Sequence, residues 1–161
     1  MSAHPAPRHH PAPRHRPDSP GLPDPLHEPA FYAGVAVKRA LAWVIDFGLI
    51  WVLAAVVLPF TLFTALFFFG FLLLVTGFVY RWGTLAFGSA TWGMWFMGIE
   101  LRQADGGPMS GGTAFLHTLG YTLSIAMVPV QVVSAILMLA LGRGQGLTDL
   151  ALGTAALNRR V

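Results

Sequence analysis

The sequence predicts an all-α membrane protein, and three observations lead to this fold class. First, 55% of the 161 residues are hydrophobic and only 11% are Asp, Glu, Lys or Arg, whereas soluble domains carry about 25% charged residues. Second, residues 40–80 contain one charged side chain in an otherwise uncharged run. Third, a further apolar block occupies residues 112–141. The main partner expected for such a chain is the lipid bilayer.

The run from residue 40 to residue 80 is predicted to form two transmembrane helices. As a single helix it would extend about 60 Å, twice a hydrocarbon core of about 30 Å. Pro59 lies near the middle of the run and marks the turn. The two helices are therefore expected at about 36–58 and 61–80.

Residues 88–110 predict a short interfacial helix followed by a strand and a turn. The segment WGMWFMG is apolar, too short to cross a membrane, and contains tryptophans that favour an interface. The segment IELRQ, residues 99–103, alternates apolar and polar side chains, and ADGGP supplies turn residues. We expect residues 99–103 to pair with residues 154–158 on the cytoplasmic side.

The block at residues 112–141 is predicted to be a helical hairpin broken at Pro129. As one span it would place Arg143, Arg159 and Arg160 on the opposite side of the membrane, whereas a hairpin returns them to the starting side. The positive-inside rule favours the hairpin, with both termini cytoplasmic. Each half is barely long enough to span, so the block crosses twice or dips into the bilayer and returns. The basic residues that would then share one side are Lys38, Arg39, Arg81, Arg102, Arg143, Arg159 and Arg160.

Residues 1–30 are expected to form a disordered cytoplasmic tail in front of a membrane domain over residues 31–161. The tail is rich in Pro, His and Arg, and the hexamer HPAPRH occurs twice in tandem. Its prolines block regular helices and strands, and it contains almost no side chains that could form a core.

Asp46 is expected to lie at an intramembrane polar site, because a charged group inside a bilayer needs a partner or a function. Arg39 lies on the same helix face, but about 10.5 Å away along the axis and directed away from Asp46. It is expected to anchor the helix at lipid phosphates. His117 should lie at the depth of Asp46, about 8 Å from the hydrocarbon boundary, so an Asp46–His117 pair is predicted. Asp46 then either carries an ion or proton, or connects helices.

Three segments in this order resemble the RDD family of small bacterial membrane proteins: RALAWVID, GSATWGMWFMGIEL and LTDLALGT. The resemblance covers residues 31–157, and the family's arginine and two aspartates would be Arg39, Asp46 and Asp149. Asp149 could equally cap a short helix. Further residues that match the family's motifs are Thr91, Gly93, Gly98, Gly153 and Thr154. The sequence departs from the family at Met94 and Gly146, where basic residues are expected.

The resemblance implies an inner-membrane protein that transports a small ion or ligand, with cation/proton exchange the suggested activity. From the intramembrane Asp46 together with this resemblance, we expect a multi-pass homo-oligomer that moves or senses a small ion or solute. A membrane-anchored scaffold that binds a cytoplasmic partner through its tail and residues 81–111 is the alternative. There are no cysteines and no hydrolase, protease or nucleotide-binding motifs, so no enzyme activity, cofactor or metal site is expected. No basic run with interleaved aromatics occurs outside the apolar blocks, so no nucleic-acid partner is expected.

Overall fold

The computed structural model describes residues 21–159, so residues 1–20 of the predicted tail and residues 160–161 lie outside it. Residues 21–30, assigned above to the tail, contact the rest of the chain. The Tyr32 hydroxyl donates a hydrogen bond to the Pro23 carbonyl at 2.8 Å. Leu22 packs on a small apolar cluster that contains Tyr32, Ala155 and Leu157.

Two helices of the described chain are long and apolar enough to cross a membrane, as predicted. Helix α1 spans Val35–Val57, and α2 spans Phe69–Gly88. Pro59 has no N–H to continue the hydrogen-bond ladder, and α1 gives way at this point to the 3-10 turn η2, Leu58–Thr61. Leu62 and Phe63 then adopt left-handed backbone angles, and η3, Thr64–Phe68, leads into α2.

The predicted bounds of the second helix are wrong at both ends. Residues 58–68 form the turn, so α2 begins at Phe69 rather than near residue 61. The helix then continues past residue 80 to Gly88, which places Arg81 inside it. Arg81 is tolerated there because an aspartate and an aromatic ring from neighbouring helices face its guanidinium group.

The short helix, the strand pair and the broken hairpin are all confirmed. Strands β1 and β2 are antiparallel, from Ile99↔Asn158 to Arg102↔Ala155. The hairpin bends by 118° at Met127, where the helix that precedes Pro129 ends. The remaining elements are η1, Pro29–Phe31; α3, Trp92–Phe96; β1, Ile99–Arg102; α4, Gly111–Ala126; α5, Val128–Ala140; α6, Leu147–Leu152; and β2, Ala155–Asn158.

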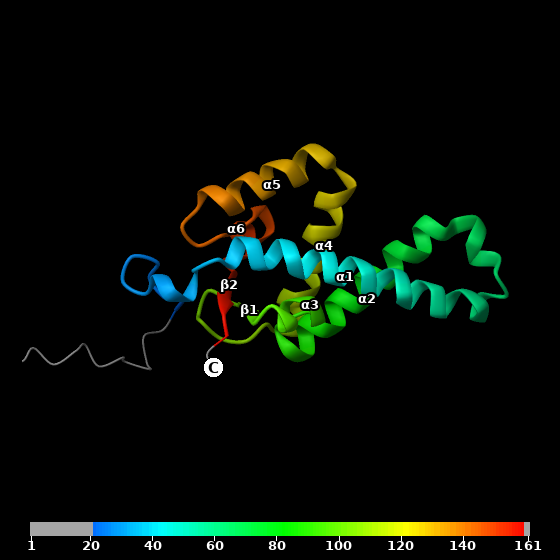
Figure 1. Cartoon of the computed structure of the whole chain (residues 1–161), viewed down its shortest axis with the longest axis horizontal. Helices are drawn as coiled ribbons and strands as arrows, with labels where there is room; N and C mark the ends of the chain where they lie inside the picture. Colours follow the sequence, from blue (N-terminus) through cyan, green and yellow to red (C-terminus); the bar gives the residue numbers. More distant parts are fainter. Residues whose placement is uncertain (1–20, 160–161) are drawn as a thin grey trace, which may run out of the picture.

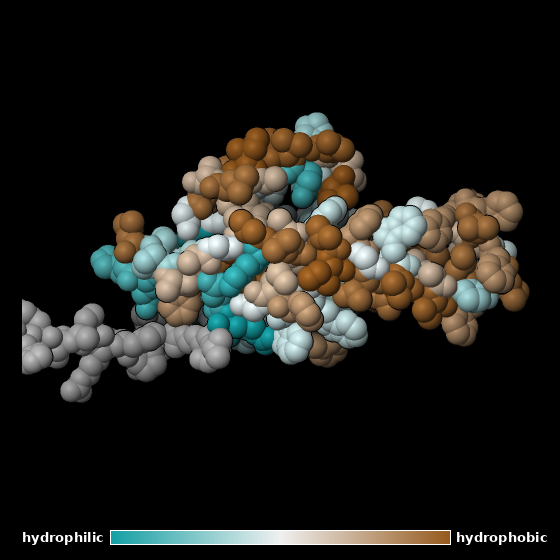
Figure 2. Space-filling view, in the orientation of Figure 1, coloured by the Kyte–Doolittle hydropathy of each residue, from teal (hydrophilic) through white to brown (hydrophobic). Residues whose placement is uncertain are grey.

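The described chain has the sheet toward one end and the α1–α2 tip at the other (Figure 1), and these are its polar and apolar ends (Figure 2). The strands, α3 and α6 surround the first half of α1, while the α1–α2 tip projects beyond every other element. Hydrophilic residues gather at the sheet end and apolar side chains cover the tip (Figure 2). Helix α4 packs against α2, and the bent pair α4–α5 covers only the half of the α1–α2 hairpin near the sheet.

Candidate functional site

Asp46 lies at the junction of α1, α2 and α3, with 1% of its surface exposed. Its Oδ1 accepts hydrogen bonds from the Tyr80 hydroxyl at 2.7 Å and the Gly93 N–H at 2.9 Å. Its Oδ2 accepts a hydrogen bond from the Thr91 hydroxyl at 2.7 Å and lies 3.7 Å from Nη2 of Arg81. We call these five residues the Asp46 cluster.

The start of α3 is shaped to hold this carboxylate. Thr91 caps the helix by accepting a hydrogen bond from the Met94 N–H, while its own hydroxyl donates to Asp46. Gly93 allows the close approach, because a Cβ atom there would lie 2.3 Å from the Ala42 carbonyl oxygen and 2.7 Å from Asp46 Oδ1. The family-like motif therefore presents one hydroxyl and one backbone N–H to Asp46.

Asp149 is the centre of a second buried cluster, also with 1% of its surface exposed. Its Oδ1 accepts hydrogen bonds from His117 Nε2 at 2.9 Å and the Thr154 hydroxyl at 3.1 Å. Its Oδ2 pairs with Nη1 of Arg39 at 2.7 Å and accepts a hydrogen bond from the Gly146 N–H at 3.0 Å. We call these five residues the Asp149 cluster.

The Asp149 cluster joins four parts of the chain. Arg39 comes from α1 and His117 from α4, while Gly146 immediately precedes α6. Gly153 ends α6 in the left-handed conformation at φ 65°, which favours glycine. Thr154 follows and turns back toward Asp149. Asp149 therefore both caps its own helix and binds two distant side chains.

The electrostatic surroundings of Asp149 favour its charged form. Burial by itself raises the pKa of Asp149, but the charge of Arg39 and the hydrogen bond from His117 outweigh that effect. The pKa of this carboxyl therefore lies well below its ordinary value.

Acidification should consequently destabilise the fold through Asp149. A carboxyl whose pKa is depressed on folding contributes stability above its unfolded pKa of about 3.9, and this contribution is lost as the pH falls toward the folded value. We expect the melting temperature of purified protein to fall steeply below about pH 4. An Asp149→Asn variant, which cannot titrate there, should show a shallower fall, and parallel profiles would contradict this role.

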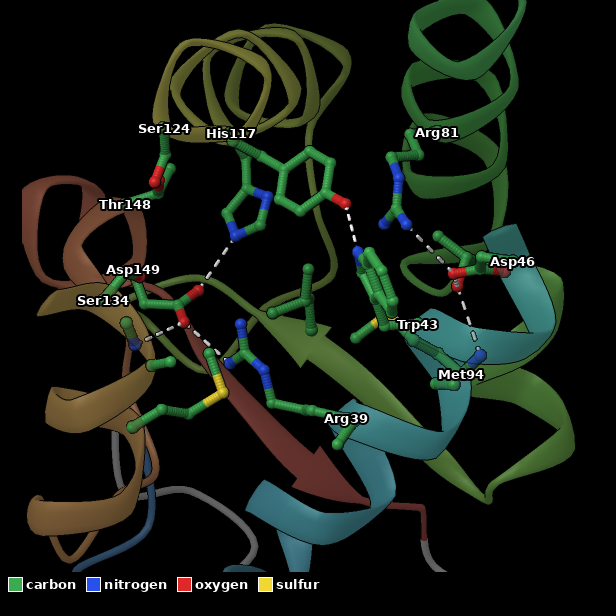
Figure 3. Close-up of a pocket in the computed structure, with 18 of the residues that line it drawn as sticks. Arg39, Trp43, Asp46, Arg81, Met94, His117, Ser124, Ser134, Thr148 and Asp149 are labelled. Carbon is green, nitrogen blue, oxygen red and sulfur yellow. Dashed lines mark hydrogen bonds and ion pairs between the residues drawn. The ribbon is translucent and has the colours of Figure 1, made fainter. Parts of the chain in front are cut away.

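Both aspartates and both of their arginines line one cavity of about 550 Å³. Figure 3 shows Asp149 and Asp46 on opposite sides of this cavity, with Trp43 between them. Trp43 Nε1 donates a hydrogen bond to the Tyr121 hydroxyl at 2.6 Å, and the guanidinium carbon of Arg81 lies 4.2 Å from the centre of the Tyr121 ring. The cavity is therefore bordered by two Arg–Asp pairs with aromatic side chains between them.

Both carboxylates are already surrounded by donors. Two oxygens offer about four acceptor positions. Asp149 faces four donors within 3.1 Å, and Asp46 accepts three hydrogen bonds and has the Arg81 guanidinium 3.7 Å away. A cation that entered the cavity would have to displace one of these donors before it reached either carboxylate. Within residues 21–159, no group of three His, Asp or Glu side chains could hold a metal ion. The two aspartates thus hold arginines and backbone amides in place.

The predicted pair between Asp46 and His117 is wrong. Both side chains border the cavity, but His117 contacts Asp149, and the partners of Asp46 come from α2 and the start of α3. The prediction that Arg39 anchors at lipid phosphates is also wrong, because its side chain is only 13% exposed and pairs with Asp149. The expected absence of an Arg39–Asp46 pair agrees with these contacts.

The structure brings most of the motif residues into the two clusters. Thr91 and Gly93 bind Asp46, while Thr154 joins Arg39 at Asp149. Gly98 does not line the cavity; it has φ 68° in the turn before β1. Tyr80, Arg81 and Thr118 were missed as site residues. The available signal was Arg81 itself, the first charge after the long apolar run.

A family model described as the RDD family matches residues 33–153. The chain belongs to the RDD family. The match includes the arginine and both aspartates that the sequence resemblance singled out, and it ends at Gly153. Comparisons with curated proteins and with solved structures gave no significant match. In this RDD protein the three named residues divide between two clusters, with Arg39 paired to Asp149 and Asp46 paired to Arg81.

Proposed function

We propose that this RDD protein binds a small ion or polar solute in the cavity and moves or senses it in a bacterial inner membrane. The observation that carries the proposal is the presence of two buried Arg–Asp pairs around one cavity in an otherwise apolar domain. Charged groups inside membrane domains commonly mark the paths or binding sites of ions and solutes. A purely structural core would not need an open space of this size between them.

The polar end of the molecule is proposed to face the cytoplasm. Basic side chains gather there: Lys38 donates a hydrogen bond to Asn158, and Arg102 and Arg159 both pair with Glu100. The positive-inside rule assigns such an end to the cytoplasmic side. Both termini would then be cytoplasmic, and the cavity would lie near the inner surface of the membrane.

Cation/proton exchange is the activity that the family suggests, and the geometry constrains how it could work. A cation would have to replace a donor at Asp46 or Asp149, and a proton on either carboxylate would weaken a fully formed cluster. A cargo that accepts hydrogen bonds from the arginines avoids both costs. We therefore favour a cargo that is recognised by the basic side chains.

A transport path would need more than the cavity of one chain. The tip of the α1–α2 hairpin extends beyond α4 and α5 (Figure 1), and its side chains are apolar and exposed, among them Phe60, Leu62, Phe67 and Phe68. A homo-oligomer in which these tips surround a path is the arrangement we propose for transport. A sensor would need only the cavity.

The scaffold alternative is less well supported by the contacts. Residues 81–111 were its expected docking segment, yet Thr91, Gly93 and Met94 are buried in the domain, and Thr91 and Gly93 bind Asp46. This segment therefore already has a structural role within the chain.

Blocking the cavity should stop cargo binding or flux. Ala135 on α5 lines the cavity and is not buried by other side chains, so we expect Ala135→Trp to place an indole there. We expect this variant to lose any flux that the wild type shows in a proteoliposome screen of protons, cations and small anions. Val133→Trp is the matched control on the same helix, outside the cavity lining. Full activity of Ala135→Trp, or no wild-type binding and flux, would contradict the proposal.

A further inference from the structure

Arg81 points to the chemistry of the cargo. Its guanidinium group carries five N–H donors, and its side chain is only 13% exposed. Within residues 21–159 the guanidinium group makes no hydrogen bond: Asp46 Oδ2 lies 3.7 Å away, beyond hydrogen-bond distance, and the other close contact is the face of the Tyr121 ring. The charge of Arg81 is balanced, but its donors have no acceptor.

Thr118 provides a second, independent observation. It is 1% exposed, lines the same cavity, and its hydroxyl is the one fully buried side-chain polar group in the described chain that has no hydrogen-bond partner. It lies on α4 three residues before Tyr121, so it is one helical turn away from the ring that Arg81 covers. A buried hydroxyl without a partner is costly, which indicates that a ligand supplies the missing contact.

The charged groups around the cavity favour an anionic ligand. Asp149 faces four donors within 3.1 Å. Asp46 accepts three hydrogen bonds, and the positive charge of Arg81 lies 3.7 Å from it. Arg81, in contrast, has N–H groups to spare. Asp46 keeps three hydrogen bonds from other donors, so Arg81 can bind a second anionic group without leaving that carboxylate unpaired. The cavity therefore offers donors and requires acceptors.

We propose that the cavity is an oxyanion site for a phosphate-type group, bound by the guanidinium of Arg81 and the hydroxyl of Thr118. The planar fork of an arginine matches two oxygens of such a group, and the threonine hydroxyl donates to a third. Arg39, across the cavity, adds positive charge at the second wall. This proposal rests on the cavity being the cargo site and names the class of cargo.

The phosphate group could belong to a free anion or to a lipid headgroup. Figure 2 shows a hollow between α5 and α1 on the side of the molecule, and exposed apolar side chains of these helices, among them Val44 and Leu139, line the cavity. A lipid lying against this surface could place its headgroup in the cavity, and a soluble oxyanion could enter from the polar end. The two sources share the same contacts with Arg81 and Thr118, and experiment must separate them.

The first experiment measures inorganic phosphate binding by titration calorimetry on the full chain in a phosphate-free neutral detergent. We expect saturable binding that Thr118→Val weakens about tenfold to a hundredfold, the usual effect of losing a hydrogen bond to a charged group. Thr122→Val is the matched control, because the Thr122 hydroxyl donates to the Thr118 carbonyl and does not line the cavity. Thr118→Val should melt at the wild-type temperature or above, since it removes a hydroxyl that has no partner.

The second experiment asks whether the protein retains phosphatidylglycerol from vesicles that mix it with phosphatidylcholine. In one outcome the wild type retains phosphatidylglycerol without binding free phosphate, while Thr118→Val retains less of the lipid. This result would identify a lipid headgroup as the source of the phosphate group and would support the site. The site is wrong if wild type binds neither probe, or if Thr118→Val binds like wild type. The cavity-blocking test is independent, because Ala135→Trp could still stop the flux of a cargo that is not an oxyanion.

Discussion

Asp149→Ala is expected to lower the free energy of unfolding by about 3–5 kcal/mol, the usual cost of removing one member of a buried ion pair. Arg39 would keep its charge in a site where its side chain is 13% exposed, with only the weak 3.4 Å contact to the Gly144 carbonyl left. His117 and Thr154 would lose their partner as well. The measurement is thermal or denaturant unfolding of the purified protein.

A double-mutant cycle shows whether this cost comes from the pair. Asp149→Ala combined with Arg39→Met should be more stable than the sum of the single changes predicts, because no unpaired charge remains. Asp105→Ala, in the exposed turn before α4, is the control for loss of a carboxylate and should have little effect. Additive single changes would show that Arg39 and Asp149 do not depend on each other.

Gly93→Ala is expected to cost about 3 kcal/mol, from overpacking and the loss of a hydrogen bond to a charged group. The added Cβ atom would meet the Ala42 backbone and the Asp46 carboxylate, and the Ala42 carbonyl cannot move without shifting α1. Helix α3 would therefore separate from α1. Gly88→Ala is the matched control within the same motif, because a Cβ at Gly88 meets nothing within 4 Å.

The same variant should also release the polar contacts of Asp46. Displacement of the residue-93 N–H from Asp46 would leave the carboxylate with the Tyr80 and Thr91 hydroxyls and the distant Arg81. We expect the melting temperature of Gly93→Ala to fall well below those of wild type and Gly88→Ala. Equal melting temperatures for the two alanine variants would contradict the close packing of α3 on α1.

The fold was largely predictable because its main elements depend on local signals. The apolar run has a proline near its middle, and the structure turns there. The alternation in IELRQ predicts a strand, and β1 forms at that place. The end of α2 was not predictable from charge alone. Arg81 resembles a boundary residue in the sequence, but contacts from α1 and α4 keep it inside the helix.

The clusters were less predictable, because two side chains at the same depth in the membrane touch only if their helices also turn them toward each other. Asp46 and His117 were expected at one depth, but the direction in which each helix faces depends on packing that the sequence does not state. Asp46 faces α3, whereas His117 faces α6. The motif around Thr91 and Gly93 contained the better signal, since a capping threonine and a glycine predict a close approach.

The most direct test of the donor-lined cavity is a comparison of ligands by thermal stabilisation of the full-length protein. A ligand that binds only the folded state raises the melting temperature. At matched ionic strength, phosphate or phosphatidylglycerol should raise the melting temperature of the wild type but not the melting temperature of Thr118→Val. Sodium, potassium and calcium should have no specific effect on either protein. Stabilisation by one of these cations that disappears in Asp46→Asn, with none by either phosphate-bearing ligand, would contradict the oxyanion site.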